Sequence, residues 1–161
     1  MTERVSLCIA TYRRPKRLAM LIRDLAQSSQ LPDQVVIVDN EGAGGARAVV
    51  EAALAEGLPF PIDYAIQPAR NIALTRNKTV ELATGDWLGF LDDDERVPPT
   101  WLETMLSAAR RFHADAVLGP VIPVVPDEAP GWIRRGRFYD FPRMQTGQPV
   151  ALNLMRFGNV L

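Results

Sequence analysis

Cysteine and histidine are almost absent from this chain, which holds one of each in 161 residues. Cys8 has no second cysteine with which to form an internal disulfide bond, and its apolar neighbours indicate a buried thiol in a strand. His113 lies near the end of an expected helix without an evident partner residue, which is typical of a helix-terminal position. Neither residue is therefore a candidate nucleophile or catalyst.

An excess of charge of one sign is also missing, because 18 Lys and Arg are balanced by 19 Asp and Glu. Without a basic stripe, nucleic acid is not an expected partner. No apolar stretch approaches the ~20 residues of a membrane span, and the N-terminus does not resemble a signal peptide. We therefore expect a cytoplasmic protein with no transmembrane segment, and a peripheral position at the inner face of the membrane stays open.

Short apolar runs alternate with amphipathic segments from the N-terminus onward. Each run is rich in Val, Ile and Leu, and apolar residues at helical spacing follow it. Strands are predicted at 5–10, 34–38, 62–66 and 87–91, and helices around 18–25, 46–56 and 71–83. This order predicts an α/β fold with a mostly parallel central sheet flanked by helices.

A further helix is marked by Thr100 and Glu103, which have the spacing of a capping box. Its apolar residues share one helical face, and they are Leu102, Met105, Leu106 and Ala109. Residues 116–125 are apolar and extended, but from Pro126 onward the sequence has no clear periodicity. The regular α/β pattern is therefore expected to end at about residue 125.

Polar residues follow each predicted strand where it ends. Ligands of an open parallel α/β sheet bind outside the carboxyl ends of the strands, so we expect these residues to share one edge. They are Thr11 to Arg14, Asp39 with Asn40, residues 67–71, and Asp92 to Glu95.

Four consecutive carboxylates, Asp92 to Glu95, come directly after an apolar strand. Two carboxylates about 4 Å apart repel by roughly 4 kcal/mol at an effective dielectric constant near 20. A divalent cation relieves this repulsion, and carboxylate oxygens suit Mg²⁺ or Mn²⁺ whose other ligands are phosphate oxygens of a substrate. The run therefore predicts a metal site for a diphosphate ligand. The alternative is an acidic loop before a helix, whose N-terminal dipole favours negative charge.

Basic residues at the same edge are candidate phosphate ligands. Arg70 and Asn71 precede a predicted helix, where free backbone amides and the helix dipole attract phosphate oxygens. Arg14 follows the first strand, and a phosphate contact and a solvated position both stay open for it. Arg76 falls inside the helix and is interpreted as a solvated helix charge.

Asp39 and the aromatic residues near the C-terminus each have two interpretations. Asp39 closes a β-branched strand, so it can accept hydrogen bonds from a base or ribose, or from its own turn backbone. The aromatic residues suit either a sugar-stacking surface or a core, and they are Trp132, Phe138, Tyr139 and Phe141.

Four segments together resemble family 2 glycosyltransferases. They are VSLCIATYRR at 5–14, VVIVDN at 35–40, ARN at 69–71 and GDWLGFLDDDE at 85–95. The ordered set is far more specific than its DxD string alone, which is short and frequent. The resemblance implies an inverting enzyme with the GT-A fold, a Rossmann-like nucleotide-diphospho-sugar transferase fold.

The resemblance also implies roles for individual residues. Asp92 and Asp94 take the DxD positions, so that Asp92 approaches the ribose and Asp94 coordinates a Mg²⁺ or Mn²⁺ ion bridging the diphosphate. Asp39 would bind the base. The predicted nucleotide-sugar-binding residues are Thr11, Tyr12, Arg14, Asp39, Arg70, Asn71, Asp92 and Asp93, and the predicted metal ligands are Asp94 and Asp92.

The general base is not assigned to a residue. Residues 158–161 (GNVL) resemble an acceptor-side segment of the family, with Phe157 where Thr or a small residue is usual. The family's base, an Asp or Glu, follows that segment, so we expect it beyond Leu161 in a longer protein. Carboxylates without a matching motif are Asp127, Glu128 and Asp140. The expected organisation is a nucleotide-sugar-binding domain at 1–125 and the beginning of an acceptor-side region at 126–161.

The expected function is metal-dependent transfer of a sugar, with inversion, from a nucleoside diphosphate sugar to an acceptor hydroxyl in polysaccharide biosynthesis. A UDP-sugar is the expected donor, and a glycan or a lipid-linked molecule is the expected acceptor. A nucleotidyltransferase is the alternative enzyme, although residues 13–16 lack the glycines of its phosphate loop. A non-catalytic nucleotide-sugar-binding or scaffold domain is the third interpretation.

Overall fold

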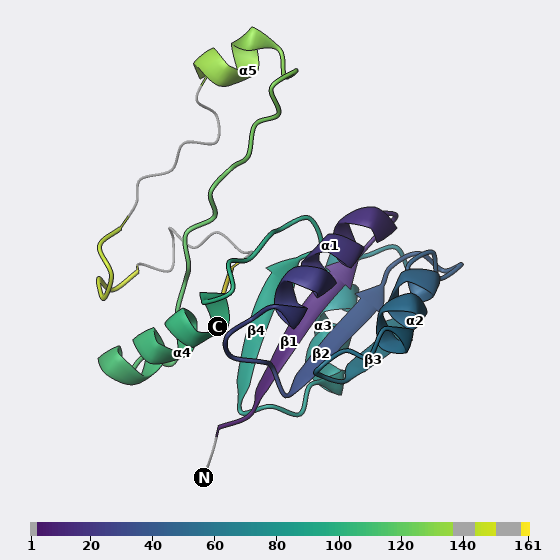
Figure 1. The fold of residues 1–161 in the computed structure, drawn as a ribbon, viewed down its shortest axis with the longest axis horizontal. Coiled ribbons are helices and arrows are strands. Elements are labelled where there is room, and N and C mark those ends of the chain that lie inside the picture. Colours follow the sequence, from purple (N-terminus) through teal and green to yellow (C-terminus); the bar gives the residue numbers. More distant parts are fainter. Residues whose placement is uncertain (1–2, 137–143, 151–158) are drawn as a thin grey trace.

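Four parallel strands form the centre of the fold in the computed structural model, which describes residues 3–136, 144–150 and 159–161 (Figure 1). The strands are β1 (Val5–Thr11), β2 (Gln34–Asp39), β3 (Ile62–Ile66) and β4 (Trp87–Asp92). Their spatial order is β3-β2-β1-β4, and every neighbouring pair is parallel. The predicted α/β fold with a parallel central sheet is confirmed.

The two central strands are buried almost throughout. Every residue of β2 is buried, and β1 is buried except at Ala10. Helices cover both faces of a parallel sheet, which is why these strands are continuous Val, Ile and Leu runs rather than alternating ones. Cys8 is 2% exposed, and burial raises the pKa of its thiol, as expected for an inert core residue.

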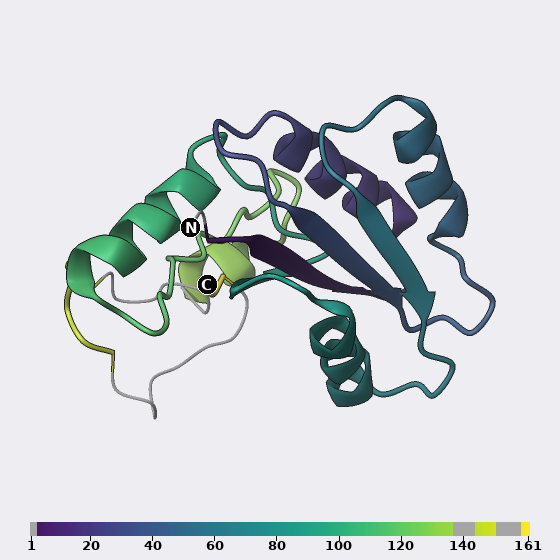
Figure 2. The same cartoon turned by 90° about the horizontal axis from the view of Figure 1, so that it is seen from below.

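Three helices cover the two faces of the sheet. α1 (Pro15–Ala26) and α2 (Arg47–Ala55) lie on one face, and α3 (Ile72–Leu82) lies on the other (Figure 2). α1 starts with a proline, whose fixed φ suits the first helical turn. The residues that α1 buries are those at the predicted spacing, namely Leu18, Leu21, Ile22 and Leu25.

A fourth helix, α4 (Trp101–Phe112), packs beside β4 (Figure 1). The predicted apolar face is confirmed, since Leu102, Met105, Leu106 and Ala109 are all buried. The predicted capping box is wrong: within the described part of the chain Thr100 makes no side-chain cap hydrogen bond. Glu103 instead accepts a hydrogen bond from Ser29 Oγ at 2.7 Å, which links α4 to the loop that follows α1. His113 ends the helix at φ 49°, in its expected terminal position.

Residues 116–125 run extended along the outside of the molecule after α4. Leu118 forms an isolated bridge with Val160, while Val124 is 89% exposed. The short helix α5 (Gly131–Gly136) lies away from the sheet at the far end of this excursion (Figure 1). Val160 also bridges to Phe90 of β4 in antiparallel orientation, and Leu161 is 4% exposed within the core. Residues 159–161 therefore lie along β4.

Buried polar groups connect the strands at the amino end of the sheet. Ser6 Oγ donates to Gln34 Oε1 at 2.5 Å and accepts from the Gly85 N–H at 2.8 Å. Gly85 approaches β1 so closely that an added Cβ would lie 2.6 Å from Ser6 N and 2.9 Å from Arg4 O. Only glycine fits between the α3–β4 turn and this strand.

Gly85→Ala is expected to lower the free energy of unfolding by about 1–3 kcal/mol, because backbone must shift to admit the methyl group. Urea unfolding followed by circular dichroism measures this change. Gly42→Ala is the matched control, since a Cβ there would lie 3.9 Å from the Pro68 Cα, in ordinary van der Waals contact. Equal stability of the two variants would contradict the close packing described for Gly85.

Candidate functional site

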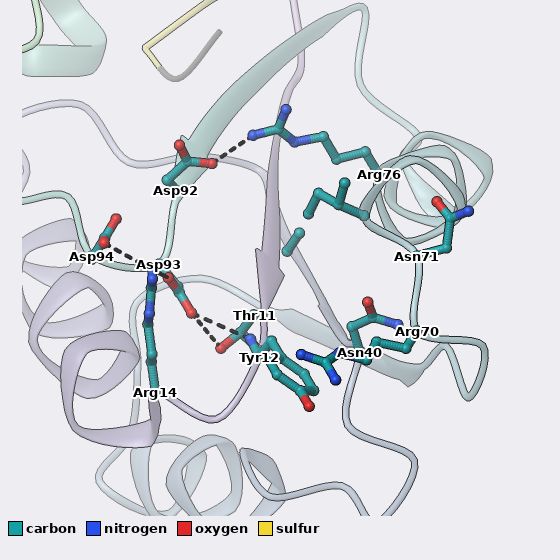
Figure 3. Close-up of a pocket in the computed structure, with 12 residues that line it drawn as sticks. Thr11, Tyr12, Arg14, Asn40, Arg70, Asn71, Arg76, Asp92, Asp93 and Asp94 are labelled. Carbon is teal, nitrogen blue, oxygen red and sulfur yellow. Dashed lines mark hydrogen bonds and ion pairs between the residues drawn. The ribbon is translucent and has the colours of Figure 1, made fainter.

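The carboxyl ends of the strands border a pocket of about 680 Å³ (Figure 3). Its lining includes every predicted site residue except Asp39. The lining also contains four residues that the sequence did not single out as ligands, namely Ala10, Asn40, Ile72 and Arg76. All four strand ends therefore contribute residues to one pocket, while Arg13, Asp39, residues 67–69 and Glu95 lie outside its lining.

The two DxD carboxylates pair with arginines from two different elements. Asp92, the last residue of β4, accepts a hydrogen bond from Arg76 Nη2 of α3 at 2.6 Å. Asp94 accepts one from Arg14 Nη1, just before α1, at 2.8 Å. Both carboxylate side chains are 42% exposed, so each retains surface for a further ligand. The prediction that Arg76 is only a solvated helix charge is wrong, because α3 lies beside the end of β4 and directs this residue to the acidic run.

Asp93 has different surroundings from its two neighbours. It is 4% exposed, and its two oxygens accept hydrogen bonds from the last residue of β1 and from the turn after it. Oδ2 accepts from Thr11 Oγ1 at 2.8 Å and from the Tyr12 N–H at 3.4 Å, and Oδ1 accepts from Arg14 Nη1 at 3.0 Å. The carboxylate thus joins the end of β4 to the end of β1.

Glu95 completes the acidic run and lies partly buried behind Asp92. Its Oε2 accepts a hydrogen bond from the Asp92 N–H at 3.1 Å. Desolvation by burial, together with the nearby charges of Asp92 and Asp94, raises the pKa of Glu95 to about 7, while that hydrogen bond and the charge of Arg76 act to lower it. The run therefore contains one carboxyl group that is half-protonated near neutral pH.

Two guanidinium groups approach the ring of Tyr12. Arg70 Cζ is 4.9 Å from the ring centroid and Arg13 Cζ is 5.2 Å from it. Arg13 also pairs with Glu41 at 2.9 Å, which fixes it on the outer side. Figure 3 shows the Arg70 guanidinium beside the Tyr12 ring at the pocket wall, so these two predicted residues lie together.

Asn71 is the N-cap of α3. Its Oδ1 accepts hydrogen bonds from the backbone N–H groups of Ala73 at 2.9 Å and Leu74 at 3.2 Å. The expectation of free amides at this helix start is wrong for these two groups, because the side chain of Asn71 already satisfies them. Asn71 nevertheless lines the pocket, as predicted.

Asp39 and Asn40 at the end of β2 point to different surroundings. Asp39 is 1% exposed and accepts hydrogen bonds from the Glu41 N–H at 2.8 Å, the Ala46 N–H at 2.9 Å and Tyr64 Oη at 3.0 Å. Burial and this hydrogen bond raise the pKa of Tyr64 to about 12, so the phenol stays a donor. Asp39 therefore holds the loop after β2, outside the lining of the pocket, and its predicted contact with a base stays a prediction.

Asn40 lines the pocket in place of Asp39. Its Nδ2 donates to the carbonyl oxygens of Gln67 at 2.9 Å and Ala69 at 2.7 Å, which anchors the loop that carries Arg70. Because both amide protons point to carbonyls, the orientation of the carboxamide is fixed and Oδ1 is its remaining polar atom. The available signal was the alternation of side chains along a strand, which makes Asp39, the last residue of β2, and Asn40, which follows it, point in different directions.

A family model described as glycosyl transferase family 2 matches residues 6–159 of the chain. The chain belongs to this family. The succinoglycan biosynthesis protein ExoM of Rhizobium meliloti is 42% identical over 142 residues, which cover 86% of this chain and 45% of ExoM. The galactofuranosyltransferase GlfT1 of Mycobacterium tuberculosis is 30% identical over 133 residues, covering 79% of this chain and 42% of GlfT1. The chain thus spans less than half the length of these relatives.

Solved structures share the fold of this family 2 chain. S. aureus TarS 1-349 in complex with UDP-GlcNAc has a TM-score of 0.63 at 20% identity, over 75% of this chain and 37% of that one. The mannosyltransferase PcManGT from Pyrobaculum calidifontis, in complex with GDP-Man and Mn²⁺, has a TM-score of 0.64 at 19% identity. That likeness covers 74% of this chain and 36% of PcManGT. The predicted GT-A fold is confirmed.

The donor set of this family 2 chain suits a metal that takes part of its coordination from a substrate. Among the described residues, no group of three or more His, Cys, Asp or Glu side chains is arranged to hold an ion. Asp92 and Asp94 supply two partly exposed carboxylates at one rim. Mg²⁺ is commonly bound through one or two carboxylates together with waters and substrate phosphates, so the residues present fit Mg²⁺ or Mn²⁺ in that arrangement.

The predicted acceptor-side residues are described only in part. Asn159 Oδ1 accepts a hydrogen bond from Trp101 Nε1 at 2.7 Å, and Asn159 Nδ2 donates to Pro120 O at 3.4 Å. Trp132 lies on α5 and is 60% exposed. Asp127 and Glu128 are both exposed. The other residues of these predictions lie outside the described residues, and they are Phe138, Tyr139, Asp140, Phe141, Phe157 and Gly158. In the described part of the chain no helix is long and apolar enough to cross a bilayer.

Glu95→Gln is expected to stabilise the metal-free protein at pH 8 but not at pH 4.5. The raised pKa means that the folded state holds this proton more tightly than the unfolded state does. The stability that this tighter proton binding contributes is fully present below pH 4.5, the ordinary pKa of a glutamate, and is lost as pH rises through about 7. Gln keeps an acceptor for the Asp92 N–H without this loss. Thermal melts across that pH range in chelating buffer measure the difference, and a difference that does not change with pH would contradict the assignment.

Proposed function

We propose that this chain is the donor-binding part of an enzyme that moves a sugar from a nucleoside diphosphate sugar to an acceptor hydroxyl, with inversion at the anomeric carbon. The observation that carries the proposal is one pocket that joins an aromatic wall at Tyr12 to two carboxylate–arginine pairs at Asp92 and Asp94. A nucleoside diphosphate has the matching chemistry, with a flat base at one end and anionic oxygens at the other.

The diphosphate would lie at the acidic end of the pocket. Asp92 and Asp94 would hold a Mg²⁺ or Mn²⁺ ion, which when bound stabilises the negative charge of the leaving diphosphate. Arg14 and Arg76 border the same space, where their guanidinium groups can donate to phosphate oxygens. The sugar-phosphate bond would then break beside two fixed positive charges.

The base would lie against Tyr12, with Arg70 framing the same wall. We assign the polar contact to Asn40, because its Oδ1 is a hydrogen-bond acceptor that borders the pocket. Uracil N3–H and guanine N1–H can donate to such an acceptor, whereas cytosine N3 and adenine N1 cannot. Asp39 supports this contact by holding the loop that follows β2.

The relatives support a nucleotide sugar as donor and a glycan as product. TarS was solved with UDP-GlcNAc and PcManGT with GDP-Man, and both nucleotides carry the base N–H that Asn40 would bind. We propose a UDP-sugar as the donor and, from ExoM, an acceptor that is a glycan or a lipid-linked glycan in polysaccharide biosynthesis. In this proposal residues 1–125 bind the donor and residues 126–161 begin the acceptor side.

UDP binding is expected to require Mn²⁺ or Mg²⁺. Titration calorimetry should give binding heat with UDP and Mn²⁺ together and little heat with UDP in EDTA. Asp94→Asn should weaken UDP binding about tenfold or more, because a charged ligand of the metal is lost. Asp115→Asn removes the same charge away from the donor pocket and should leave the affinity unchanged. Metal-independent binding of UDP would refute the metal site.

Asn40 is expected to select the base. UDP should bind about tenfold more tightly than CDP, because the cytosine N3 lone pair would face Oδ1 of Asn40 without a proton between them. Asn40→Ala should bring the ratio of the two dissociation constants toward one, while Tyr12→Phe, which keeps the ring, should preserve it. Competition titrations with both nucleotides measure the ratios. Equal binding of UDP and CDP to the unaltered protein would exclude this contact.

A further inference from the structure

Asp93 lies where the backbone pairing between β1 and β4 ends. The last pair in the register of these strands is Ala10 with Asp92, so Thr11 and Asp93 are the next residues along. Thr11 Oγ1 donates to Asp93 Oδ2 at 2.8 Å, and this side-chain contact continues the pairing where the backbone ladder stops. Beyond this point β1 leads into the turn at Tyr12 and β4 leads into the acidic run at Asp94.

The surroundings of Asp93 use both of its carboxylate oxygens. Oδ2 accepts from Thr11 and from the Tyr12 N–H, while Oδ1 accepts from Arg14 Nη1. The residue is 4% exposed, in contrast to the partly exposed side chains of Asp92 and Asp94 on either side. A carboxylate with three protein donors and almost no exposed surface is poorly placed to coordinate a metal or contact a sugar.

We propose that Asp93 is a positioning residue that fixes the spacing between the base subsite and the diphosphate subsite. This inference rests on the proposed function of the pocket. The groups that donate to Asp93 belong to the segment that holds Tyr12, the aromatic wall of the pocket. Asp93 itself stands between Asp92 and Asp94 in the chain. The binding of a ligand that reaches from Tyr12 to the acidic rim therefore depends on the Thr11–Asp93 contact, although this contact joins two protein side chains and does not include the ligand.

The chemistry of the site requires a carboxylate at position 93. All three groups that face it are donors, namely a hydroxyl, a backbone N–H and a guanidinium. Asparagine would offer one acceptor oxygen and turn an NH₂ group toward at least one of these donors. Asp93→Asn therefore leaves at least one of these donors without its acceptor, with almost no change in volume, and Thr11→Val removes the hydroxyl on the other side of the contact.

A double-mutant cycle with Thr11→Val and Asp93→Asn tests the coupling, with UDP titrated at saturating Mn²⁺. Each single variant should weaken UDP binding about tenfold, and the double variant should bind no more weakly than Asp93→Asn alone. Ser6→Ala is the matched control, because it removes a buried hydroxyl from the same strand at the opposite end of the sheet. It should leave UDP affinity unchanged, and thermal melts confirm that all variants are folded at the titration temperature.

Uridine, which occupies only the base subsite, distinguishes a spacing role from general loss of structure. Both variants should bind uridine with the affinity of the unaltered protein in an NMR titration while UDP binding falls. Equal loss of uridine and UDP binding would overturn the spacing role.

The Mn²⁺ dependence distinguishes positioning from ligation. The Mn²⁺ concentration for half-maximal UDP binding should rise strongly in Asp94→Asn and much less in Asp93→Asn, because only Asp94 is a proposed metal ligand. A rise in Asp93→Asn as large as in Asp94→Asn, with additive effects in the cycle, would make Asp93 a metal ligand and overturn the inference alone. Absence of UDP binding to the unaltered protein would instead overturn the proposed function, and the inference with it.

Discussion

Repulsion among four consecutive carboxylates is the constraint around which this pocket is built. The repulsion between like charges at this spacing raises the free energy of the folded state by several kcal/mol unless each charge is compensated. The structure compensates each carboxylate differently. Asp92 pairs with Arg76 of α3 and Asp94 pairs with Arg14 before α1. Asp93 accepts hydrogen bonds from the end of β1 and the turn after it, and Glu95 has a pKa raised to about 7. Partners from β1, from the turn after it and from α3 therefore meet at the end of one strand.

The parallel sheet makes this convergence geometrically available. All four strands run in the same direction, so β1, β2 and β4 end at one edge and the helices that follow them begin nearby. The pairs at Asp92 and Asp94 then connect the sheet to helices on opposite faces, since α1 and α3 lie on different sides (Figure 2). The acidic run thus helps to hold the helices against the sheet, in addition to lining the pocket.

Most strands, and the location of the site, could be predicted because both depend on local patterns. Buried Val and Ile runs identify β1 and β2, and polar residues after them identify the edge. Arg76 could not be recognised this way, since α3 buries only Thr75 and Thr79 and its weak pattern does not show which side faces β4. The choice between Asp39 and Asn40 depends on the side-chain direction at the last residue of β2. The capping box failed because Glu103 found a tertiary partner in Ser29.

Residues 159–161 give β4 a neighbour on the side away from β1. Val160 exchanges backbone hydrogen bonds with Phe90, and Leu161 exchanges them with Val117. A strand whose outer N–H and C=O groups are bare is a template on which other chains can pair and aggregate. Residues 159–161, which come after α5 in the sequence, therefore also cover the outer edge of the sheet, and a change in this short segment would expose the outer backbone groups of β4 to other chains.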